Sequence, residues 1–195
     1  LTRVANTRSG PAKWRGWSLA RPVAPVVEAI EHLVVASHPA EAFESLSALL
    51  LEWLSCQAVA LQVPTISAEP VLYQRGASLD LPGIGVGWRG GGASSAGSLL
   101  GAEYRVHDDL ARTFAFGEDA WLVRAGFRSA VRAVFLIGGR EAGRFAAFAE
   151  DRGHFTPSRV RLLREMAPVL TWLCRLFALA EQMQAESEIG DCLDE

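Results

Sequence analysis

The sequence predicts an α+β protein with a central antiparallel sheet of five to six strands and helices at both ends of the chain. Apolar residues recur at helical spacing near both ends, whereas the middle of the chain holds short stretches with the two-residue period of strands. Two of these stretches, 127–137 and 142–148, flank Gly138-Gly139-Arg140. Because glycine accepts the positive φ of a tight turn, this pair is expected to form a hairpin, which makes the sheet antiparallel.

Two helices are expected before the first strand. They meet at Ser37-His38-Pro39, where Ser37 or His38 ends one helix and Pro39 begins the next, since proline is tolerated in the first turn of a helix. Their apolar faces consist of Val26, Ile30, Leu33 and Val34 in the first helix, and of Phe43, Leu46, Leu50, Leu51 and Leu54 in the second.

Strands are expected over 57–63 and 70–75. His107-Asp108-Asp109 is the only local cluster of potential metal ligands in the sequence. An Asp at such a position more often caps a following helix than binds a metal, so we expect Asp109 to be a helix cap and expect no metal site. In the strand 127–137, alternation places Phe127, Val131, Phe135, Ile137, Ser129 and Ala133 on one face and Arg128, Arg132, Val134 and Leu136 on the other.

The last element is predicted to be a long helix that starts at Thr156-Pro157 and runs to about Ile189. About 30 residues at ~1.5 Å each make it about 45 Å long. It carries two apolar stripes, of which one can face the sheet. The other stripe consists of Leu162, Met166, Val169, Leu173, Leu176, Ala180 and Met183. Because this stripe needs a partner, we expect a parallel homodimer through the first and final helices.

The composition indicates one globular domain, 22–186, with a basic N-terminal extension, 1–21, and an acidic tail or linker to an output domain, 187–195. The chain is 50% hydrophobic and 21% charged, with a net charge of −3. No apolar run approaches the ~20 residues of a membrane span, and 1–21 lacks the apolar core of a secretory signal. We therefore expect a cytoplasmic location and no membrane partner. Since the sequence does not begin with Met, we expect a fragment of a longer chain.

The sequence contains motifs of dinucleotide-binding and nucleic-acid-binding sites, but their surroundings do not fit these functions. Residues 85–90 read G-x-G-x-x-G, but a dinucleotide site needs a strand before this motif and a helix after it, whereas Pro82 precedes it and Gly91-Gly92 follow. We expect a loop here, with a short helix over 93–100. The five basic residues of 1–21 are too spread out for a nucleic-acid site. No Ser-His-Asp, paired-carboxylate or activated-Cys arrangement indicates catalytic residues.

Three motifs lie within residues 104–148. Asp108-Asp109-Leu110 follows a strand, residues 118–124 form a helical pattern, and Ala125-Gly126-Phe127-Arg128-Ser129 enters the central strand. In this combination the region resembles a GAF domain. The Gly-Gly hairpin and the Phe155-Thr156-Pro157 start of the final helix extend the resemblance to about 22–186. It implies a GAF/PAS-like fold, with the terminal helices on one face of the sheet and a pocket under loops and short helices on the other.

The resemblance places this pocket between the sheet and the segments 82–101 and 106–125. The expected ligand-binding residues are Trp88, Tyr104, His107, Phe114, Phe116, Trp121 and Arg128. Arg128 either pairs with an acid of the lid, such as Asp108 or Glu118, or reaches the ligand.

The resemblance also implies a non-catalytic, small-ligand-sensing and dimerisation input domain of a bacterial signal transduction or transcriptional regulatory protein. The resemblance identifies neither a particular ligand nor a cofactor, and the expected partners are a small molecule, a second copy and a linked output domain. One alternative is a ligand-free dimerisation module. Another is an enzyme like free methionine sulfoxide reductase, although Cys56, Cys174 and Cys192 lie outside the region where that chemistry needs thiols. The same lack of a pocket Cys argues against bilin attachment, and Phe116-Gly117-Glu118-Asp119 matches only part of the cyclic-nucleotide pattern.

Overall fold

The structure is a computed structural model that describes residues 23–64, 70–77, 83–85 and 100–193. The N-terminal extension 1–21, the glycine-rich segment 86–92 and nearly all of the expected short helix 93–100 lie outside these residues. Leu100 itself begins a strand.

A five-stranded antiparallel sheet forms the centre of the molecule, as the sequence predicts. Its strands are β1 (Ala58–Val63), β2 (Val71–Gly76), β3 (Leu100–His107), β4 (Ser129–Ile137) and β5 (Arg140–Ala149), in the order β2-β1-β5-β4-β3. The turn between β4 and β5 has positive φ at Gly138 (56°) and Gly139 (77°), which confirms the predicted hairpin.

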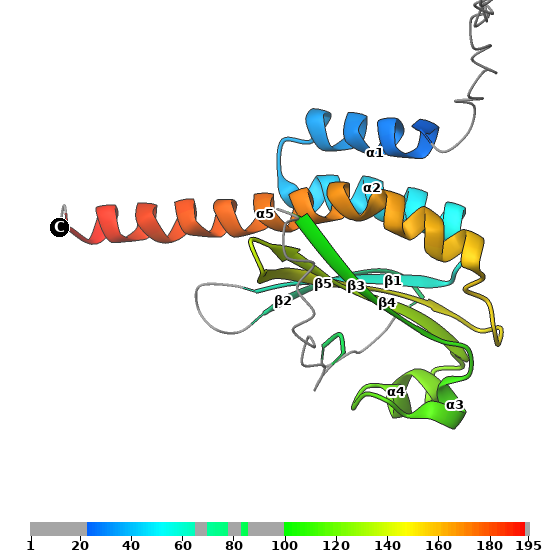
Figure 1. Cartoon of the computed structure of the whole chain (residues 1–195). Coiled ribbons are helices and arrows are strands. Elements are labelled where there is room, and N and C mark those ends of the chain that lie inside the picture. The colour runs from blue at the N-terminus through cyan, green and yellow to red at the C-terminus, as the bar shows by residue number, and fades with distance from the viewer. Residues whose placement is uncertain (1–22, 65–69, 78–82, 86–99, 194–195) are drawn as a thin grey trace, which may run out of the picture.

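Three helices cover one face of the sheet: α1 (Val23–Val35), α2 (Pro39–Leu54) and α5 (Pro157–Leu193). Figure 1 shows α2 and α5 directly on the sheet and α1 stacked on the outer side of this layer. His38 caps α2, since its Nδ1 accepts a hydrogen bond from the Ala40 amide at 3.2 Å. None of the described helices is both long and apolar enough to cross a bilayer.

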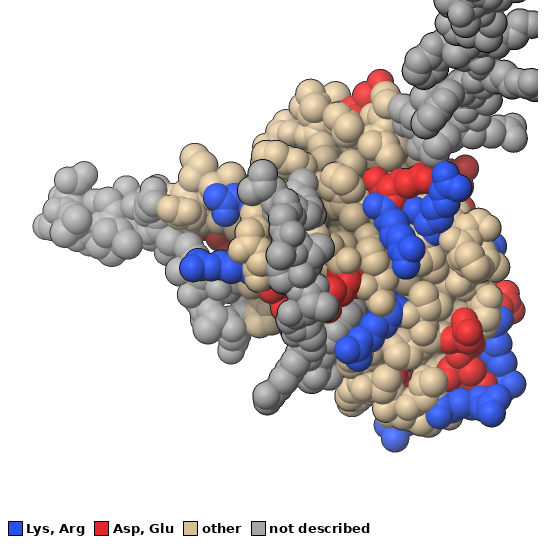
Figure 2. All heavy atoms as spheres, in the orientation of Figure 1, with Lys and Arg blue, Asp and Glu red and all other residues tan. Residues whose placement is uncertain are grey.

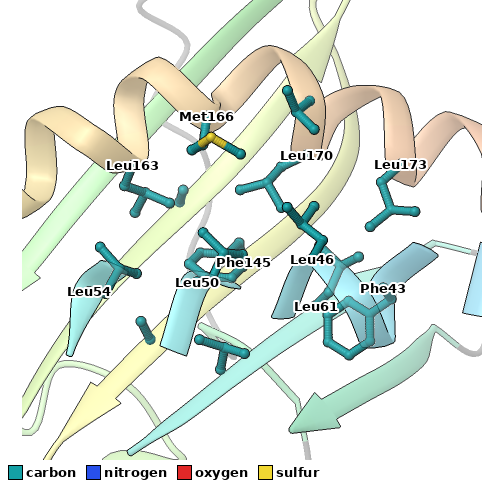
Figure 3. Packing of buried hydrophobic residues seen from close by; sticks show 14 of the residues in the cluster. Phe43, Leu46, Leu50, Leu54, Leu61, Phe145, Leu163, Met166, Leu170 and Leu173 are labelled. Carbon is teal, nitrogen blue, oxygen red and sulfur yellow. The ribbon is translucent and has the colours of Figure 1, made fainter. Parts of the chain in front are cut away.

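The main core lies between these helices and the sheet (Figure 3). Apolar side chains of α2 and α5 meet Leu61 of β1 and Phe145 of β5, and each is worth about 1.5–3 kcal/mol when fully buried. The helical contributors labelled in Figure 3 are Phe43, Leu46, Leu50, Leu54, Leu163, Met166, Leu170 and Leu173.

The prediction that the outer stripe of the final helix is exposed within one chain is wrong in part. Val169 and Leu173 are 3% and 0% exposed, because α1, α2 and the sheet together enclose more of α5 than a sheet alone could. Over the part of α5 whose side chains the structure describes, up to Met183, the large apolar residues left open are Trp172 (59% exposed), Leu176 (36%), Leu179 (40%) and Met183 (71%). The helix also contains Pro168 in its interior, where a proline lacks the amide hydrogen of a regular helical residue. At ~1.5 Å per residue its 37 residues span about 56 Å, and Figure 1 shows its C-terminal half projecting beyond the sheet.

The other face of the sheet carries a lid made of α3 (Leu110–Thr113), α4 (Asp119–Arg124) and the segment 83–85. Asp109 caps α3 through a hydrogen bond from the Ala111 amide to Oδ1 at 3.2 Å, as the sequence predicts. A second apolar cluster lies under the lid and consists of Ala58, Ala60, Ile84, Leu110, Leu122, Phe127, Ala130, Ala146 and Phe148.

Phe127 lies in this lid cluster, so its predicted position with Val131 and Phe135 is wrong. The alternation does not reach Phe127, because β4 begins at Ser129 and the chain turns at Gly126, where φ is 99°.

Candidate functional site

A buried ion-pair cluster joins the lid to the sheet. Arg132 points from β4 toward the lid and is fully buried. Its Nε lies 3.2 Å from Oε1 of Glu118, and its Nη2 contacts Oδ1 of Asp119. Both carboxylates are also fully buried, at the N-terminus of α4. Desolvation makes such charges costly unless they are paired, so the pairing accounts for a buried arginine in this position.

The same carboxylates hold the lid backbone. Oε1 of Glu118 accepts a hydrogen bond from the Gly85 amide at 2.6 Å, and Oδ2 of Asp119 accepts one from the Phe116 amide at 3.0 Å. The cluster therefore connects β4, α4 and the segment 83–85.

Two sheet residues form hydrogen bonds with the backbone of the segment 83–85. Oε1 of Gln62 accepts a hydrogen bond from the Ile84 amide at 2.8 Å. Nη1 of Arg144 donates to the carbonyl oxygens of Ile84 and Gly85 at 3.1 and 3.0 Å. Together with the burial of the Ile84 side chain, these bonds fix this part of the lid.

Two buried nitrogen atoms next to this cluster have no hydrogen-bond partner within the described residues. They are Nη1 of Arg132 and Nε2 of His107. Both side chains contact Phe116: the Arg132 guanidinium carbon lies 4.6 Å from the ring centre, and the His107 ring centre lies 5.5 Å from it. A buried polar atom without a partner is costly, so these two nitrogens are the places in this region where a further hydrogen bond would be stabilising.

His107 is 9% exposed at the end of β3. Burial lowers its pKa below the ordinary 6.5, and the positive charge of Arg132 lowers it further. The imidazole is therefore neutral at neutral pH and offers one donor and one acceptor.

Of the residues predicted for the site, the structure brings His107 and Phe116 together beside Arg132. Phe114 and Trp121 lie on the outside of the lid and are 54% and 52% exposed. Trp88 and most of the segment 82–101 lie outside the described residues, so the full pocket stays a prediction.

Tyr104 and Arg128 lie elsewhere. Tyr104 packs against the helix-side core, because β3 alternation places it on the opposite face from His107. Arg128 is partly buried just before β4, and in the described chain no ion pair joins it to Asp108 or Glu118. Arg132, on β4, forms the ion pair with Glu118 of the lid that was one of the expectations for Arg128.

Sequence reasoning missed Arg132 as a site residue, together with its pairing to Asp119. Two signals were present: alternation placed Arg132 on the same strand face as Arg128, and Glu118-Asp119 are adjacent acids in the lid helix. Since apolar residues surround Arg132 along the strand, a buried position and a carboxylate partner could have been inferred.

The described residues contain no group of three or more His, Cys, Asp or Glu side chains that could hold a metal ion. Cys56 and Cys174 are buried free thiols in the helix-side cluster, and burial raises the pKa of each to about 12. Neither thiol lies in the lid.

The sequence matches no known family profile and no curated protein. Solved structures do match. The GAF domain of a phosphoenolpyruvate-protein phosphotransferase from Coxiella burnetii aligns with a TM-score of 0.59 and 13% identity, over 84% of this chain and 96% of that one. Free methionine-R-sulfoxide reductase from Neisseria meningitidis aligns with a TM-score of 0.59 and 19% identity, over 82% and 91%. A domain of a sensor histidine kinase from Sinorhizobium meliloti aligns with a TM-score of 0.51 and 13% identity, over 76% and 99%. With its five-stranded antiparallel sheet between a helical layer and a lid, this chain has the GAF-domain fold.

Proposed function

We propose that this chain is a non-catalytic input domain of a bacterial signalling or transcriptional regulatory protein, and that it binds a small molecule between the lid and the sheet. The fold is compatible with this role, since one similar structure is part of a sensor histidine kinase. The observation that carries the proposal is the pair of unpartnered, buried nitrogens on Arg132 and His107.

The ligand would bring a hydrogen-bond acceptor to Arg132, whose guanidinium can only donate. Neutral His107 would add a second hydrogen bond, and the ring of Phe116 would provide an apolar contact. Both nitrogens are shielded from solvent, so the ligand enters when the lid moves. This movement would break the hydrogen bond from the Gly85 amide to Glu118.

The proposal is tested by native mass spectrometry of protein purified from its own host, compared with the mass after denaturation. We expect an additional mass that disappears on denaturation and that His107→Leu reduces by about tenfold in occupancy. Arg128→Gln is the matched control, because Arg128 lies outside the cluster and should leave the occupancy unchanged. A wild-type protein that carries no additional mass would favour a ligand-free dimerisation module.

The two described cysteines, Cys56 and Cys174, favour a non-catalytic role over sulfoxide reduction, although one similar structure is a methionine sulfoxide reductase. That chemistry needs a thiolate as nucleophile, and a thiol with a pKa of about 12 is almost entirely protonated at neutral pH. We expect no consumption of a dithiol in the presence of free methionine sulfoxide. Turnover that depends on Cys56 or Cys174 would contradict the non-catalytic assignment.

The second part of the proposal is a parallel homodimer through α1 and α5. Apolar side chains of these two helices line a hollow of about 430 Å³, and the most exposed of the lining residues are Val34 and Trp172. We call this surface the dimer stripe; it consists of Val26, Ile30, Leu33, Val34, Pro168, Val169, Trp172 and Leu176. A second copy would cover it, since an exposed apolar patch of this kind usually marks an interface. On the face shown in Figure 2, by contrast, acidic and basic side chains lie interspersed.

Sedimentation velocity tests the dimer. The wild type should sediment as a dimer at tens of micromolar, and a Trp172→Glu, Leu176→Glu double variant should sediment as a monomer, because both side chains are exposed within one chain. Leu173 is unsuitable for this test, since charging a side chain that is 0% exposed would unfold the domain. Arg161→Gln, on an exposed part of the same helix, is the control. A monomeric wild type or an unchanged variant would remove the basis for the dimer.

A further inference from the structure

A second hollow lies on the helix side of the sheet, where the edge strand β3 meets α5. Its volume is about 260 Å³, smaller than a site for a drug-sized ligand. Its lining consists of Gly101, Ala102, Tyr104, Arg164, Ala167, Pro168 and Thr171, all of which the structure describes. It is separate from the lid, since Tyr104 and His107 point to opposite faces of β3.

Small side chains and a proline leave this space open. Gly101, Ala102 and Ala167 are too short to fill the gap between strand and helix. Pro168 has no amide hydrogen, so the carbonyl of Arg164, one turn earlier, lacks its usual helical donor. The wall of the hollow therefore combines small apolar side chains with a backbone carbonyl that lacks its helical donor.

Two polar side chains at the hollow lack suitable partners. Arg164 is exposed, and among the described residues no carboxylate lies within ion-pair distance of it. Its guanidinium carbon lies 5.4 Å from the centre of the Tyr104 ring. The Tyr104 hydroxyl is buried and has no hydrogen-bond partner within the described part of the chain.

We propose that this hollow binds a small carboxylic acid in its ionised form. Arg164 would hold the carboxylate, because the planar guanidinium matches the two carboxylate oxygens and carries no competing ion pair. The Tyr104 hydroxyl would donate a second hydrogen bond to the carboxylate after a small shift of the Arg164 side chain, which now lies beside the ring. The rest of the ligand would lie against Ala102, Ala167 and Pro168.

A ligand in this hollow would lie next to the proposed dimer interface. Pro168 lines both this hollow and the dimer stripe, so a bound acid would touch the helix segment that carries the interface. This inference does not depend on the lid site, since the two sites lie on opposite faces of the sheet.

Titration with benzoate, followed by ¹H–¹⁵N NMR shifts of the full chain, tests the proposal, with acetate as a smaller probe and with benzamide and acetamide as neutral controls. We expect saturable binding of benzoate with a Kd on the order of 1 mM and at least about tenfold weaker binding of benzamide. The shifts should centre on residues 101–104 and 164–171 and not on the lid.

Arg164→Gln should weaken benzoate binding by about tenfold and Tyr104→Phe by about threefold. Arg161→Gln is the matched control, because Arg161 is exposed on the same helix, already pairs with Glu165 at 3.0 Å, and does not line the hollow. Arg164 and Arg161 are both exposed, so neither substitution should affect folding, which thermal unfolding checks. The proposal is overturned if neither carboxylate binds, if the amides bind equally well, or if Arg164→Gln leaves the Kd unchanged.

Discussion

Substituting Arg132 with Met tests whether the buried ion pairs hold the lid to the sheet. The change leaves the carboxylates of Glu118 and Asp119 buried without the cation that now contacts both. Breaking a buried pair by removing one partner costs about 3–5 kcal/mol, a large part of the ~5–15 kcal/mol that keeps a typical domain folded. For a domain of this size the melting temperature should fall by roughly 6–20 °C.

Urea and thermal unfolding, followed by circular dichroism, measure this loss, and amide hydrogen exchange locates it. Exchange at Gly85 and Phe116 should accelerate most, because their amides donate to Glu118 and Asp119. A triple variant that also carries Glu118→Gln and Asp119→Asn should recover more than half of the loss, since no uncompensated charge then stays buried.

Arg128→Met is the matched control, with an expected change within about 1 kcal/mol, because Arg128 is only partly buried and forms no ion pair in the described chain. A loss below about 1 kcal/mol for Arg132→Met, or an equal loss for Arg128→Met, would refute the reasoning.

Three further predictions concern pH, packing and salt. Because burial and Arg132 lower the pKa of His107, the folded protein binds fewer protons there than the unfolded chain below pH 6.5. The stabilisation that His107 gives is therefore complete above pH 6.5 and is lost as the pH falls through the lowered pKa, and His107→Gln should flatten this dependence in urea titrations. Gly143→Ala should destabilise the domain by about 1–3 kcal/mol, because the added Cβ would lie 2.5 Å from Sγ of Cys174, and Cys174→Ala should relieve part of the loss. The dimer should tighten as the salt concentration rises from about 0.05 to 0.5 M, because parallel packing brings together the acidic ends 181–195, and sedimentation at each concentration measures this.

Each of these predictions has a result that contradicts it. An unchanged pH dependence in His107→Gln would mean that other groups dominate the acid response. Equal losses for Gly143→Ala with and without Cys174→Ala would show that the sulfur is not the obstacle. A dimer that weakens with salt would indicate attraction between charges across the interface instead of repulsion between the tails.

Much of the fold could be predicted from the sequence because its signals are local. The Gly138-Gly139 turn, the Asp109 cap and the start of α5 at Pro157 depend on a few adjacent residues. The alternation of β4 likewise placed Val131 and Arg132 on opposite faces, which the two clusters of the structure confirm.

The candidate site was harder to predict because its members come from distant parts of the chain. His107 and Phe116 could be named from the resemblance, but alternation within one strand does not say which face lies under the lid. Tyr104 was therefore placed with His107 although the two point to opposite faces. Phe127 was misplaced because the strand begins two residues later, after the turn at Gly126.

The sequence by itself determined the order of helices and strands and the antiparallel hairpin, because periodicity, caps and glycine turns act between neighbouring residues. Only the tertiary structure decided that Arg132, and not Arg128, is buried against Glu118 and Asp119, since that depends on how α4 packs across β4. It also decided which side of α5 stays open: Leu173 is covered by the rest of the chain, while Trp172, one residue earlier and about 100° around the helix, stays exposed.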